Sequence, residues 1–302
     1  MFIADKWQQY RIIDTCSGEK VEDWNGYILI RPDPQVIWSG DRTKPEWKSA
    51  HARYARSSSG GGAWEYSRLP ESWLLQYGDL TFRIRPTGFK HTGLFPEQAH
   101  NWDMCRKIIE GADRPLSVLN LFAYTGGATM ACAKAGARVC HVDAAKGMVA
   151  WAKENAALCE LSDAHIRYIV DDCRKFVERE IRRGVHYDAV ILDPPSFGRG
   201  PDGRIWRVES DLFGLIQTIE PLLSDSPLFV LVNAYTTGLS PGVIACVLDR
   251  AVRTKRNGYI LHDELGLPVQ DGYVLPCGSS TYWLSDEGRL LIEDDRGLAE
   301  GV

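Results

Sequence analysis

Glycine-containing and polar motifs follow four apolar segments in the middle of the chain, at the point where each segment ends. In order, they are Thr125-Gly126-Gly127, Asp143, Asp171-Asp172-Cys173 and Asp193-Pro194-Pro195-Ser196-Phe197. Paired glycines at the start of a helix allow backbone N–H groups to approach a ligand closely. An ionised carboxylate accepts two hydrogen bonds, which suits ribose hydroxyls at the second motif and an adenine amino group at the third. Together the motifs predict a site for an adenosine-containing ligand.

The last of these motifs indicates a second ligand. Pro194 and Pro195 fix two φ angles and remove two backbone donors, so the segment is expected to form a stiff, extended corner. Asp193 and the carbonyl groups of the corner then point into the cleft. Phe197 follows them, and a rigid polar corner beside an aromatic ring suits a flat heteroaromatic substrate. Asn233, after a later apolar segment, is a candidate for a further polar contact.

The secondary structure must bring these motifs together. Beyond Pro115, apolar strands alternate with amphipathic helices, which is typical of a parallel sheet with crossover helices. In such sheets ligands bind beyond the carboxyl ends of the strands, so the motifs are expected to share one pocket. The segments 259–267 and 273–283 could pair as an antiparallel edge, and the acidic end from Asp286 to Val302 is expected to fray. The predicted strands are 117–122, 138–142, 165–170, 187–192 and 228–232, with helices that include 147–159 and 173–182.

The chain before residue 99 has a different pattern. It is rich in aromatic residues, is punctuated by glycine and proline, and contains short apolar segments such as 27–30 and 80–84. We therefore expect a smaller β-rich domain over residues 1–98 and a second domain over 99–302. Between Arg42 and Lys90 there are nine basic and four acidic residues. This segment could contact RNA through phosphates and base stacking, or be an ordinary charged face over an aromatic core.

Composition narrows the remaining possibilities. The 302 residues carry a formal net charge of −5 with a pI near 5.8, values too mild to predict a partner. The eight cysteines show no C-x-x-C pair and no Cys/His ligand spacing, so free, mostly buried thiols are expected and no metal site. The first residues lack a signal-peptide pattern, and no apolar run approaches the ~18 residues of a spanning helix. We expect a cytoplasmic protein without a membrane partner.

Four stretches of the chain resemble motifs of class I S-adenosylmethionine-dependent methyltransferases. They are Asn120-Leu121-Phe122-Ala123-Tyr124-Thr125-Gly126-Gly127, Val142-Asp143-Ala144, 171–173 and 193–197. Within that class the chain resembles the bacterial group that methylates bases of 23S ribosomal RNA, over about residues 87–232. The resemblance implies an α/β fold with a seven-stranded, Rossmann-like sheet whose last strand is antiparallel, a smaller N-terminal β-rich domain and S-adenosylmethionine as cofactor. Many class I enzymes carry an acidic residue where this chain has Asn120. They also carry a third glycine in the glycine motif, which this chain lacks.

The resemblance also implies a role for each motif. The glycine motif would line the methionine end of the cofactor, Asp143 would hold the ribose, and Asp172 with Cys173 would hold the adenine. The residues implied to face the methyl acceptor are Asp193, Pro194, Phe197 and Asn233. The residues implied to bind the cofactor are Lys90, Phe95 and Gln98 on an approach segment, and Phe122, Ala123, Tyr124, Thr125, Gly126, Gly127, Asp143, Ala144, Asp171, Asp172, Cys173 and Asp193.

The cysteines bear on which atom is methylated. Methylation of cytosine C5 needs a thiolate that adds to the ring. No cysteine follows the fourth or fifth predicted strand, and Cys173 is expected at the adenine, so only Cys277 is left for this role. Nitrogen methylation is an in-line displacement in which the enzyme mainly aligns donor and acceptor. The sequence therefore favours a nitrogen of a purine base over cytosine C5. The resemblance implies that this base lies in RNA, most of all in ribosomal RNA.

Three other functions stay open at this point. A small molecule or a protein side chain could be the acceptor, which the acidic pI would suit. An NAD-binding oxidoreductase would also carry an acid such as Asp143 after a glycine-rich turn, although the missing third glycine and the two prolines count against it. An RNA-binding module without activity would show binding but no turnover.

Overall fold

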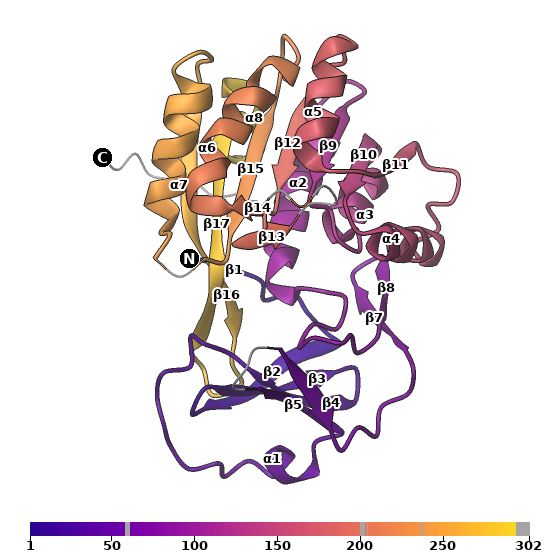
Figure 1. Cartoon of the computed structure of the whole chain (residues 1–302), viewed down its shortest axis with the longest axis vertical. Helices are drawn as coiled ribbons and strands as arrows, with labels where there is room; N and C mark the ends of the chain where they lie inside the picture. The colour runs from indigo at the N-terminus through magenta and orange to yellow at the C-terminus, as the bar shows by residue number, and fades with distance from the viewer. Residues whose placement is uncertain (58–60, 200–202, 204, 237, 294–302) are drawn as a thin grey trace. The chain divides into compact units, whose positions relative to one another are not determined.

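The computed structural model describes residues 1–57, 61–199, 203, 205–236 and 238–293 (Figure 1). It divides into two compact units. The first unit is Met1–His100 together with Leu265–Cys277, and the second is Asn101–Glu264 together with Gly278–Val302. The segment 265–277 was expected in the second domain. It belongs to the first because two long strands, β16 (Tyr259–Pro268) and β17 (Val274–Leu284), extend into that unit. The end of β16 and the start of β17 lie there.

The first unit contains a five-stranded sheet, a separate hairpin and a short helix. The sheet order is β2-β3-β4-β5-β6, antiparallel except between β4 and β5. Burial alternates along both strands of the β7-β8 hairpin, which therefore packs one face on the core. The elements are β2 (Tyr10–Cys16), β3 (Glu19–Trp24), β4 (Tyr27–Pro32), α1 (Glu46–Ser49), β5 (Ala52–Arg56), β6 (Gly62–Glu65), β7 (Trp73–Tyr77) and β8 (Leu80–Ile84).

Aromatic residues form much of the core of the first unit. Trp38 and Tyr66 are partly exposed, but the buried set includes Trp47, Tyr54, Trp73, Tyr77 and Phe82. Two of the basic side chains, Arg42 and Arg53, form ion pairs with Glu19 of the same unit. These contacts favour the interpretation of this region as a charged face over an aromatic core. Contact of the first unit with RNA stays a prediction.

A mainly parallel sheet organises the second unit, as predicted. Its order is β16-β17-β15-β12-β9-β10-β11, with β15, β12, β9, β10 and β11 parallel and β17 antiparallel to β15. The full sheet has eight strands where seven were expected, because β1 (Phe2–Ile3) pairs with Leu265 and Gly266 of β16. The parallel strands are β9 (Ser117–Leu121), β10 (Arg138–Asp143), β11 (Ile166–Val170), β12 (Ala189–Leu192) and β15 (Phe229–Ala234).

Helices cover both faces of this sheet, which explains why its central strands are almost wholly apolar. Leu119 and Leu121 of β9 share a core cluster with residues of α5, α6 and α7. On the other face, Asn120 of β9 contacts Thr129 of α3. None of the described helices is long and apolar enough to cross a membrane. The helices are α2 (Ala99–Gly111), α3 (Gly127–Lys134), α4 (Lys146–Leu158), α5 (Cys173–Arg182), α6 (Val208–Ile219), α7 (Pro241–Leu248) and α8 (Asp286–Glu293).

The C-terminal segment differs from the prediction. Residues 286–293, which were expected to fray, form α8, while 294–302 lie outside the described residues. Leu291 packs so closely on α2 that a Cβ added at Gly111 would come within 2.9 Å of its Cδ2. Lys107 donates a hydrogen bond to the carbonyl of Ile292, whose side chain is buried. Packing of an apolar face on α2 therefore orders this acidic helix.

Candidate active site

The register of the sheet brings the predicted motifs to one edge. Leu121 at the end of β9 lies opposite Val142 of β10 and Leu192 of β12, and Asp143 lies opposite Val170 of β11. The loops that follow the four strands therefore begin at nearly the same level of the sheet. In the sheet, β9 lies between β10 and β12. This is also the point where the strand order reverses, at which open α/β sheets bind ligands. Asp143 and Asp193 thus flank the end of β9 from its two sides.

The loop that leaves β9 has an unusual backbone. Phe122 and Tyr124 have φ angles of 55° and 51°, and Gly126 has a φ of 88°. Only glycine adopts this left-handed region without strain, so two of the three residues carry a conformational cost. Gly126 is the N-cap of α3 and no side chain caps the helix. Among the described residues no side chain therefore satisfies the N–H groups of the first turn of α3, and their use by a ligand, which the glycine motif predicts, stays a prediction.

Asp143 holds this loop with one carboxylate oxygen and the turn after β10 with the other. Oδ2 accepts a hydrogen bond from the backbone N–H of Tyr124 at 2.9 Å, and Oδ1 accepts one from Ala145 at 2.8 Å. Burial raises the pKa of the Asp143 carboxyl, while these two N–H groups lower it. The side chain is half-buried, and an ionised carboxylate has about four lone-pair positions. Asp143 can therefore support the loop and still accept hydrogen bonds from ribose hydroxyls.

The two glycines serve the packing of the protein itself. A Cβ at Gly127 would lie 2.6 Å from Cζ2 of Trp102, and one at Gly126 would lie 3.2 Å from Cβ of Ala152. We predicted that their small size admits a ligand, but the space that a side chain would take is filled by other residues of the second unit. The glycines allow α2 and α4 to pack against the start of α3, and the open N–H groups are a separate consequence of the loop geometry.

A buried polar chain lies beneath the start of α3. Asn120 donates a hydrogen bond to Oγ1 of Thr129 at 2.9 Å, and this hydroxyl bonds Nδ1 of His141 at 2.9 Å. All three side chains are buried. Burial lowers the pKa of His141 to about 4, so the imidazole is neutral at pH 7. Asn120, the residue that stands in place of the usual acid, therefore links the first strand to the helix that follows it.

The motif after β11 combines capping with a buried thiol. Asp172 is the N-cap of α5 and accepts a hydrogen bond from the backbone N–H of Lys175. Asp171 forms an ion pair with Arg179. Cys173 is buried, accepts a hydrogen bond from the N–H of Phe122 at 3.4 Å, and has its pKa raised by burial. The motif thus joins α5 to the loop after β9, and its contact with adenine stays a prediction.

The proline corner is anchored at both ends. The N–H of Asp193 donates to the carbonyl of Leu121 at 3.4 Å, and Nε1 of Trp206 donates to the carbonyl of Pro195 at 2.7 Å. Trp206 belongs to the hairpin β13 (Phe197–Arg199) and β14 (Ile205–Arg207), and its ring packs 5.4 Å from that of Phe122. Asp193 is half-buried and Pro194 buried. The Phe197 side chain is 55% exposed, and the guanidinium of Arg207 lies 5.7 Å from the centre of its ring. Its contact with the methyl acceptor stays a prediction.

Asn233 lies at the end of β15 and is buried. Its Oδ1 accepts hydrogen bonds from Nδ2 of Asn101 at 3.0 Å and from Oγ of Ser280 at 2.8 Å. Tyr282 donates a further hydrogen bond to Oδ1 of Asn101. The side chain therefore takes part in a network that joins α2, β15 and β17. Its role at the methyl acceptor stays a prediction.

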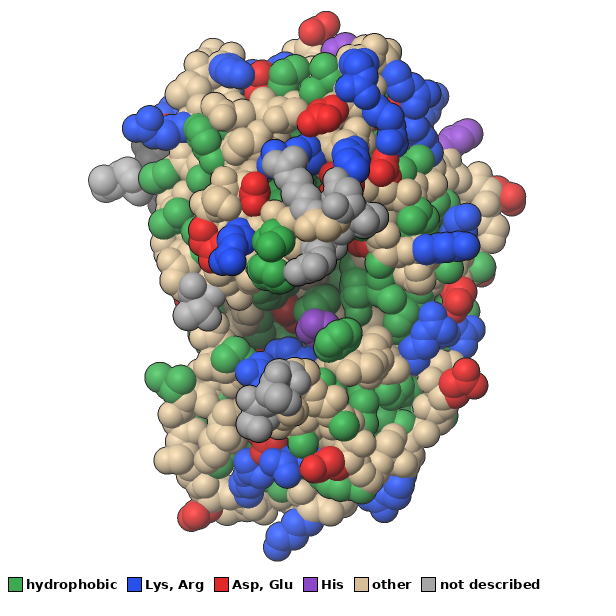
Figure 2. Space-filling view, viewed as in Figure 1, with side chains coloured by type: hydrophobic (Ala, Val, Ile, Leu, Met, Phe, Trp, Pro, Cys, Tyr) green, Lys and Arg blue, Asp and Glu red, His purple; other side chains and the backbone are tan. Residues whose placement is uncertain are grey.

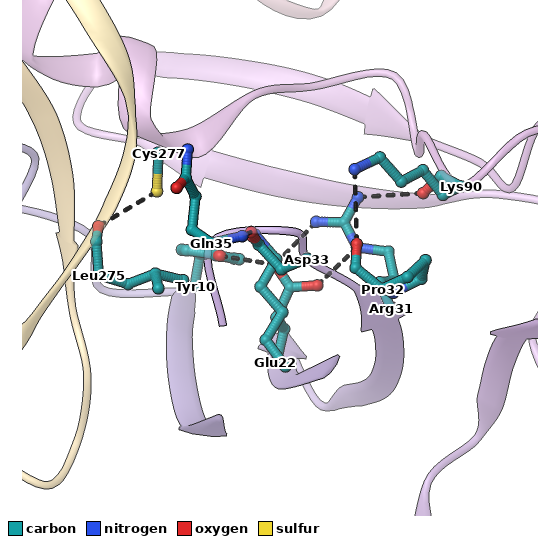
Figure 3. A network of polar contacts seen from close by, with 10 residues as sticks. Tyr10, Glu22, Arg31, Pro32, Asp33, Gln35, Lys90, Leu275 and Cys277 are labelled. Atoms are coloured by element: carbon teal, nitrogen blue, oxygen red, sulfur yellow. Dashed lines mark hydrogen bonds and ion pairs between the residues drawn. The ribbon is translucent and has the colours of Figure 1, made fainter. Parts of the chain in front are cut away.

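Lys90, Phe95 and Gln98 belong to the first unit, and their role at the cofactor stays a prediction. Figure 3 shows Lys90 beside Arg31, whose guanidinium donates to the Lys90 carbonyl at 3.1 Å. Burial, with the charge of Arg31 and of Lys20, lowers the pKa of Lys90 to about 8. The half-buried ring of Phe95 lies 5.2 Å from that of His91. Gln98 is buried in a short 3-10 helix, Pro96–Gln98.

The second unit thus offers donors and acceptors that match the ends of an adenosyl amino acid. The uncapped N-terminus of α3 suits a carboxylate, because backbone N–H groups and the helix dipole both favour an anion. Asp143 keeps acceptor capacity that would suit hydroxyl groups. The family model for S-adenosylmethionine-dependent methyltransferases matches residues 42–223. The chain belongs to this methyltransferase family. S-adenosylmethionine, rather than NAD, is therefore its cofactor.

Individual relatives agree with this family. Ribosomal RNA large subunit methyltransferase K/L of Shewanella sp. (strain MR-4) is 32% identical over 181 residues, 57% of this chain and 24% of the relative. The protein of the same name from Shewanella frigidimarina is 34% identical over 172 residues, 53% of this chain and 23% of the relative. The chain thus spans about a quarter of the length of the curated relatives it matches.

Solved structures show the same fold. The S-adenosylmethionine-dependent methyltransferase of Agrobacterium tumefaciens superimposes with a TM-score of 0.87 at 35% identity, covering 93% of both chains. A Streptococcus mutans protein described as a methyltransferase of this kind has a TM-score of 0.71 at 19% identity, over 92% of this chain and 76% of its own. The second likeness shows the fold alone. Together with the sheet order, these neighbours confirm the class I methyltransferase fold.

Sequence reasoning missed residues that contact the backbone or side chains of the predicted motifs. Trp206 braces both the proline corner and Phe122, and Asn155 of α4 donates to the carbonyl of Thr125 at 2.9 Å. Asn155 is fully buried, in the neighbourhood of the apolar Ala152 and Ala156 on the same helix. A polar residue on the apolar face of an amphipathic helix is the signal that could have indicated its role.

Proposed function

We propose that this chain is an enzyme that transfers a methyl group from S-adenosylmethionine to a nitrogen of a nucleobase in ribosomal RNA. The observation that carries the proposal is the convergence of Asp143, the open start of α3 and the Asp193 corner at one edge of the parallel sheet. An adenosyl site beside a rigid polar corner and an exposed aromatic ring suits transfer to a flat acceptor. A ribosomal RNA substrate implies that the protein acts in the cytoplasm.

Residues of the second unit would hold the cofactor. The segment Thr125–Gly127 at the start of α3 would bind the methionine end through the N–H groups of the first helical turn, because the N–H of Gly126 already donates to the carbonyl of Ala123. Asp143 would accept from the ribose hydroxyls. Asp172 and the backbone N–H of Cys173 would bind the adenine. When bound, S-adenosylmethionine supplies an activated methyl group on a positively charged sulfur. The protein then has to align the acceptor and exclude water, so no general base is required.

The proline corner would orient the acceptor. Asp193 would accept a hydrogen bond from an amino or ring N–H of the base, and Phe197 would stack on the ring. The cysteines argue against methylation at cytosine C5. Burial raises the pKa of both Cys173 and Cys277, so each thiol stays protonated near neutral pH and is a poor nucleophile. A base nitrogen, which attacks the methyl group directly, is the acceptor that this arrangement supports.

Two observations support RNA as the substrate class. The Shewanella relatives carry the name of ribosomal RNA methyltransferases, although the chain matches only about a quarter of their length. In addition, Figure 2 shows Lys and Arg side chains gathered over α5. That helix carries Arg174, Lys175, Arg179 and Arg182, of which Arg174 and Arg179 form ion pairs with Asp211 and Asp171. A local basic surface on an acidic protein suits contact with phosphates.

The experiment uses ribosomal RNA from a strain that lacks the gene. Purified protein is incubated with this RNA and S-adenosylmethionine labelled in the methyl group, and the nucleosides are then analysed by mass spectrometry. We expect label in large-subunit RNA, in a single purine nucleoside that is methylated on nitrogen. Before the incubation, RNA of the deletion strain should lack this methylated nucleoside. RNA from the wild-type strain, already modified, serves as the control and should take up little label.

Two outcomes would contradict the proposal. Label found only in 5-methylcytidine would overturn the choice of acceptor atom. Binding of S-adenosylhomocysteine without any transfer to RNA would overturn the substrate class, and would favour the alternative of a small-molecule or protein acceptor.

A further inference from the structure

Three other elements of the second unit hold the strained loop after β9. The N–H of Phe122 donates to Sγ of Cys173 at the start of α5, and the N–H of Tyr124 donates to Asp143 at the end of β10. The carbonyl of Thr125 accepts a hydrogen bond from Nδ2 of Asn155 on α4 at 2.9 Å. Side chains from three different parts of the chain thus hold the loop at Phe122, Tyr124 and Thr125.

Asn155 differs from Cys173 and Asp143 because it belongs to none of the predicted motifs. Its side chain has no exposed surface, and its neighbour Ala152, one turn earlier on α4, would lie 3.2 Å from a Cβ at Gly126. The same face of α4 therefore packs against the loop and bonds its backbone. Burying an amide is unfavourable unless it is hydrogen-bonded, and the buried Asn155 amide donates to the Thr125 carbonyl.

The loop needs such a restraint because its conformation is unfavourable by itself. Phe122 and Tyr124 have left-handed φ angles of 55° and 51° without being glycine. Each such residue costs roughly 1–3 kcal/mol, and persists only where the surrounding structure fixes it. The carbonyl that Asn155 binds immediately precedes Gly126, the N-cap of α3. A shift of this peptide would reorient the open N–H groups at the start of the helix.

We propose that Asn155 is a positioning residue for cofactor binding: from behind the loop, it holds the Thr125–Gly126 peptide in the orientation that presents the start of α3 to S-adenosylmethionine. Asn155 itself would not touch the cofactor. The inference rests on the proposed function, because it takes the start of α3 to be the place where the methionine end binds.

The test compares two buried substitutions on the same helix. Asn155→Leu keeps the approximate size of the side chain and removes the donor, and Asn155→Ala serves if leucine prevents folding. Cys159→Ala, at the buried C-terminal end of α4, is the control, because it weakens the same helix and leaves the Thr125 contact intact. Stability is measured by urea denaturation, and affinity for S-adenosylhomocysteine by calorimetric titration under conditions where every variant is folded.

We expect the Asn155 variant to bind S-adenosylhomocysteine about tenfold more weakly, since one hydrogen bond of loop restraint is lost. The control, with a similar loss of stability, should bind as the wild type does. In hydrogen exchange, the N–H groups of Tyr124 and Gly126 should lose protection in the Asn155 variant alone.

Equal affinities for wild type and the Asn155 variant would overturn the inference, as would equal weakening in both variants, because either result makes Asn155 a merely structural residue. A wild-type protein that fails to bind S-adenosylhomocysteine would instead overturn the proposed function itself.

Discussion

Charged and polar side chains are buried in both units, but they are used differently. In the first unit, Glu22 accepts hydrogen bonds from Arg31 and Tyr10 and forms an ion pair with Lys20, which also pairs with Asp33 (Figure 3). In the second unit, Asp143 is only half-buried and accepts two backbone N–H groups. The first arrangement joins charge to opposite charge, whereas the second leaves a carboxylate beside an open helix terminus.

The difference indicates which charges stabilise the fold and which can bind a ligand. The guanidinium of Arg31 and the ammonium of Lys20 lower the pKa of Glu22 to about 2, although burial acts in the opposite direction and is the largest single effect. At Asp143 none of the cations that the structure describes offsets burial, so the pKa of the carboxyl is raised. A carboxylate without a cationic partner in the protein has acceptor capacity left for hydroxyl groups. The following variants test this distinction.

The largest effect is expected for Glu22→Gln. Removing one partner of a buried ion pair leaves the charge of Arg31 uncompensated and leaves Lys20 with Asp33 alone, so we expect the free energy of unfolding to fall by about 3–5 kcal/mol. Urea denaturation of the purified protein measures it. Glu71→Gln, on the exposed surface of the same unit, is the matched control and should change stability little. A loss below about 1 kcal/mol in the buried variant would show that the network contributes little to stability.

The second effect concerns pH. Burial lowers the pKa of His141 in the second unit and of His91 in the first to about 4 each. Because the unfolded chain binds these protons near pH 6.5, stability is full above that pH and falls as the pH drops toward 4, by about 3 kcal/mol per histidine.

The contribution of Glu22, with its pKa lowered to about 2, is lost only below its ordinary value near 4.5, so the two pH windows overlap only between about 4 and 4.5. We therefore expect His141→Asn to remove roughly half of the loss between pH 6.5 and 4, measured as the urea midpoint against pH. An unchanged pH profile would mean that His141 is not held neutral in the folded protein.

The third effect is expected for Asp143→Asn. One carboxylate oxygen becomes an amide donor that faces a backbone N–H, so the loop loses a hydrogen bond and the ribose loses an acceptor. We expect affinity for S-adenosylhomocysteine to fall about 10- to 100-fold in calorimetric titration. Asp163→Asn, exposed in the same unit, is the control and should bind normally. Normal binding by the Asp143 variant would remove this residue from the cofactor site.

The architecture of the second unit could be predicted from the sequence, because its signals are local. The alternation of apolar strands and amphipathic helices predicted a strand at 117–122, where β9 spans Ser117–Leu121, and a helix at 173–182, where α5 lies. Polar residues at the strand ends predicted a shared site. The resemblance to methyltransferases, carried by short motifs at these same ends, supplied the cofactor. Parallel pairing of neighbouring strands then brings the motifs to one edge without further information.

Contacts between distant segments could not be predicted in the same way. Nothing local marks Phe122 and Tyr124 as left-handed residues, since such positions usually contain glycine. The packing of Trp102 against Gly127 joins α2 to α3 and depends on the tertiary structure. The assignment of 265–277 to the first unit likewise follows from long-range contacts, such as the ion pair between Lys44 and Asp271.

The most direct test of the central claim separates the acceptor corner from the cofactor site. Asp193→Ala is compared with wild type for affinity toward S-adenosylhomocysteine and for methyl transfer to RNA from the deletion strain. If the corner orients the acceptor, methyl transfer falls about 100-fold or more while affinity for S-adenosylhomocysteine is largely kept. A loss of affinity in step with the loss of transfer would contradict the account, because the corner would then belong to the cofactor site.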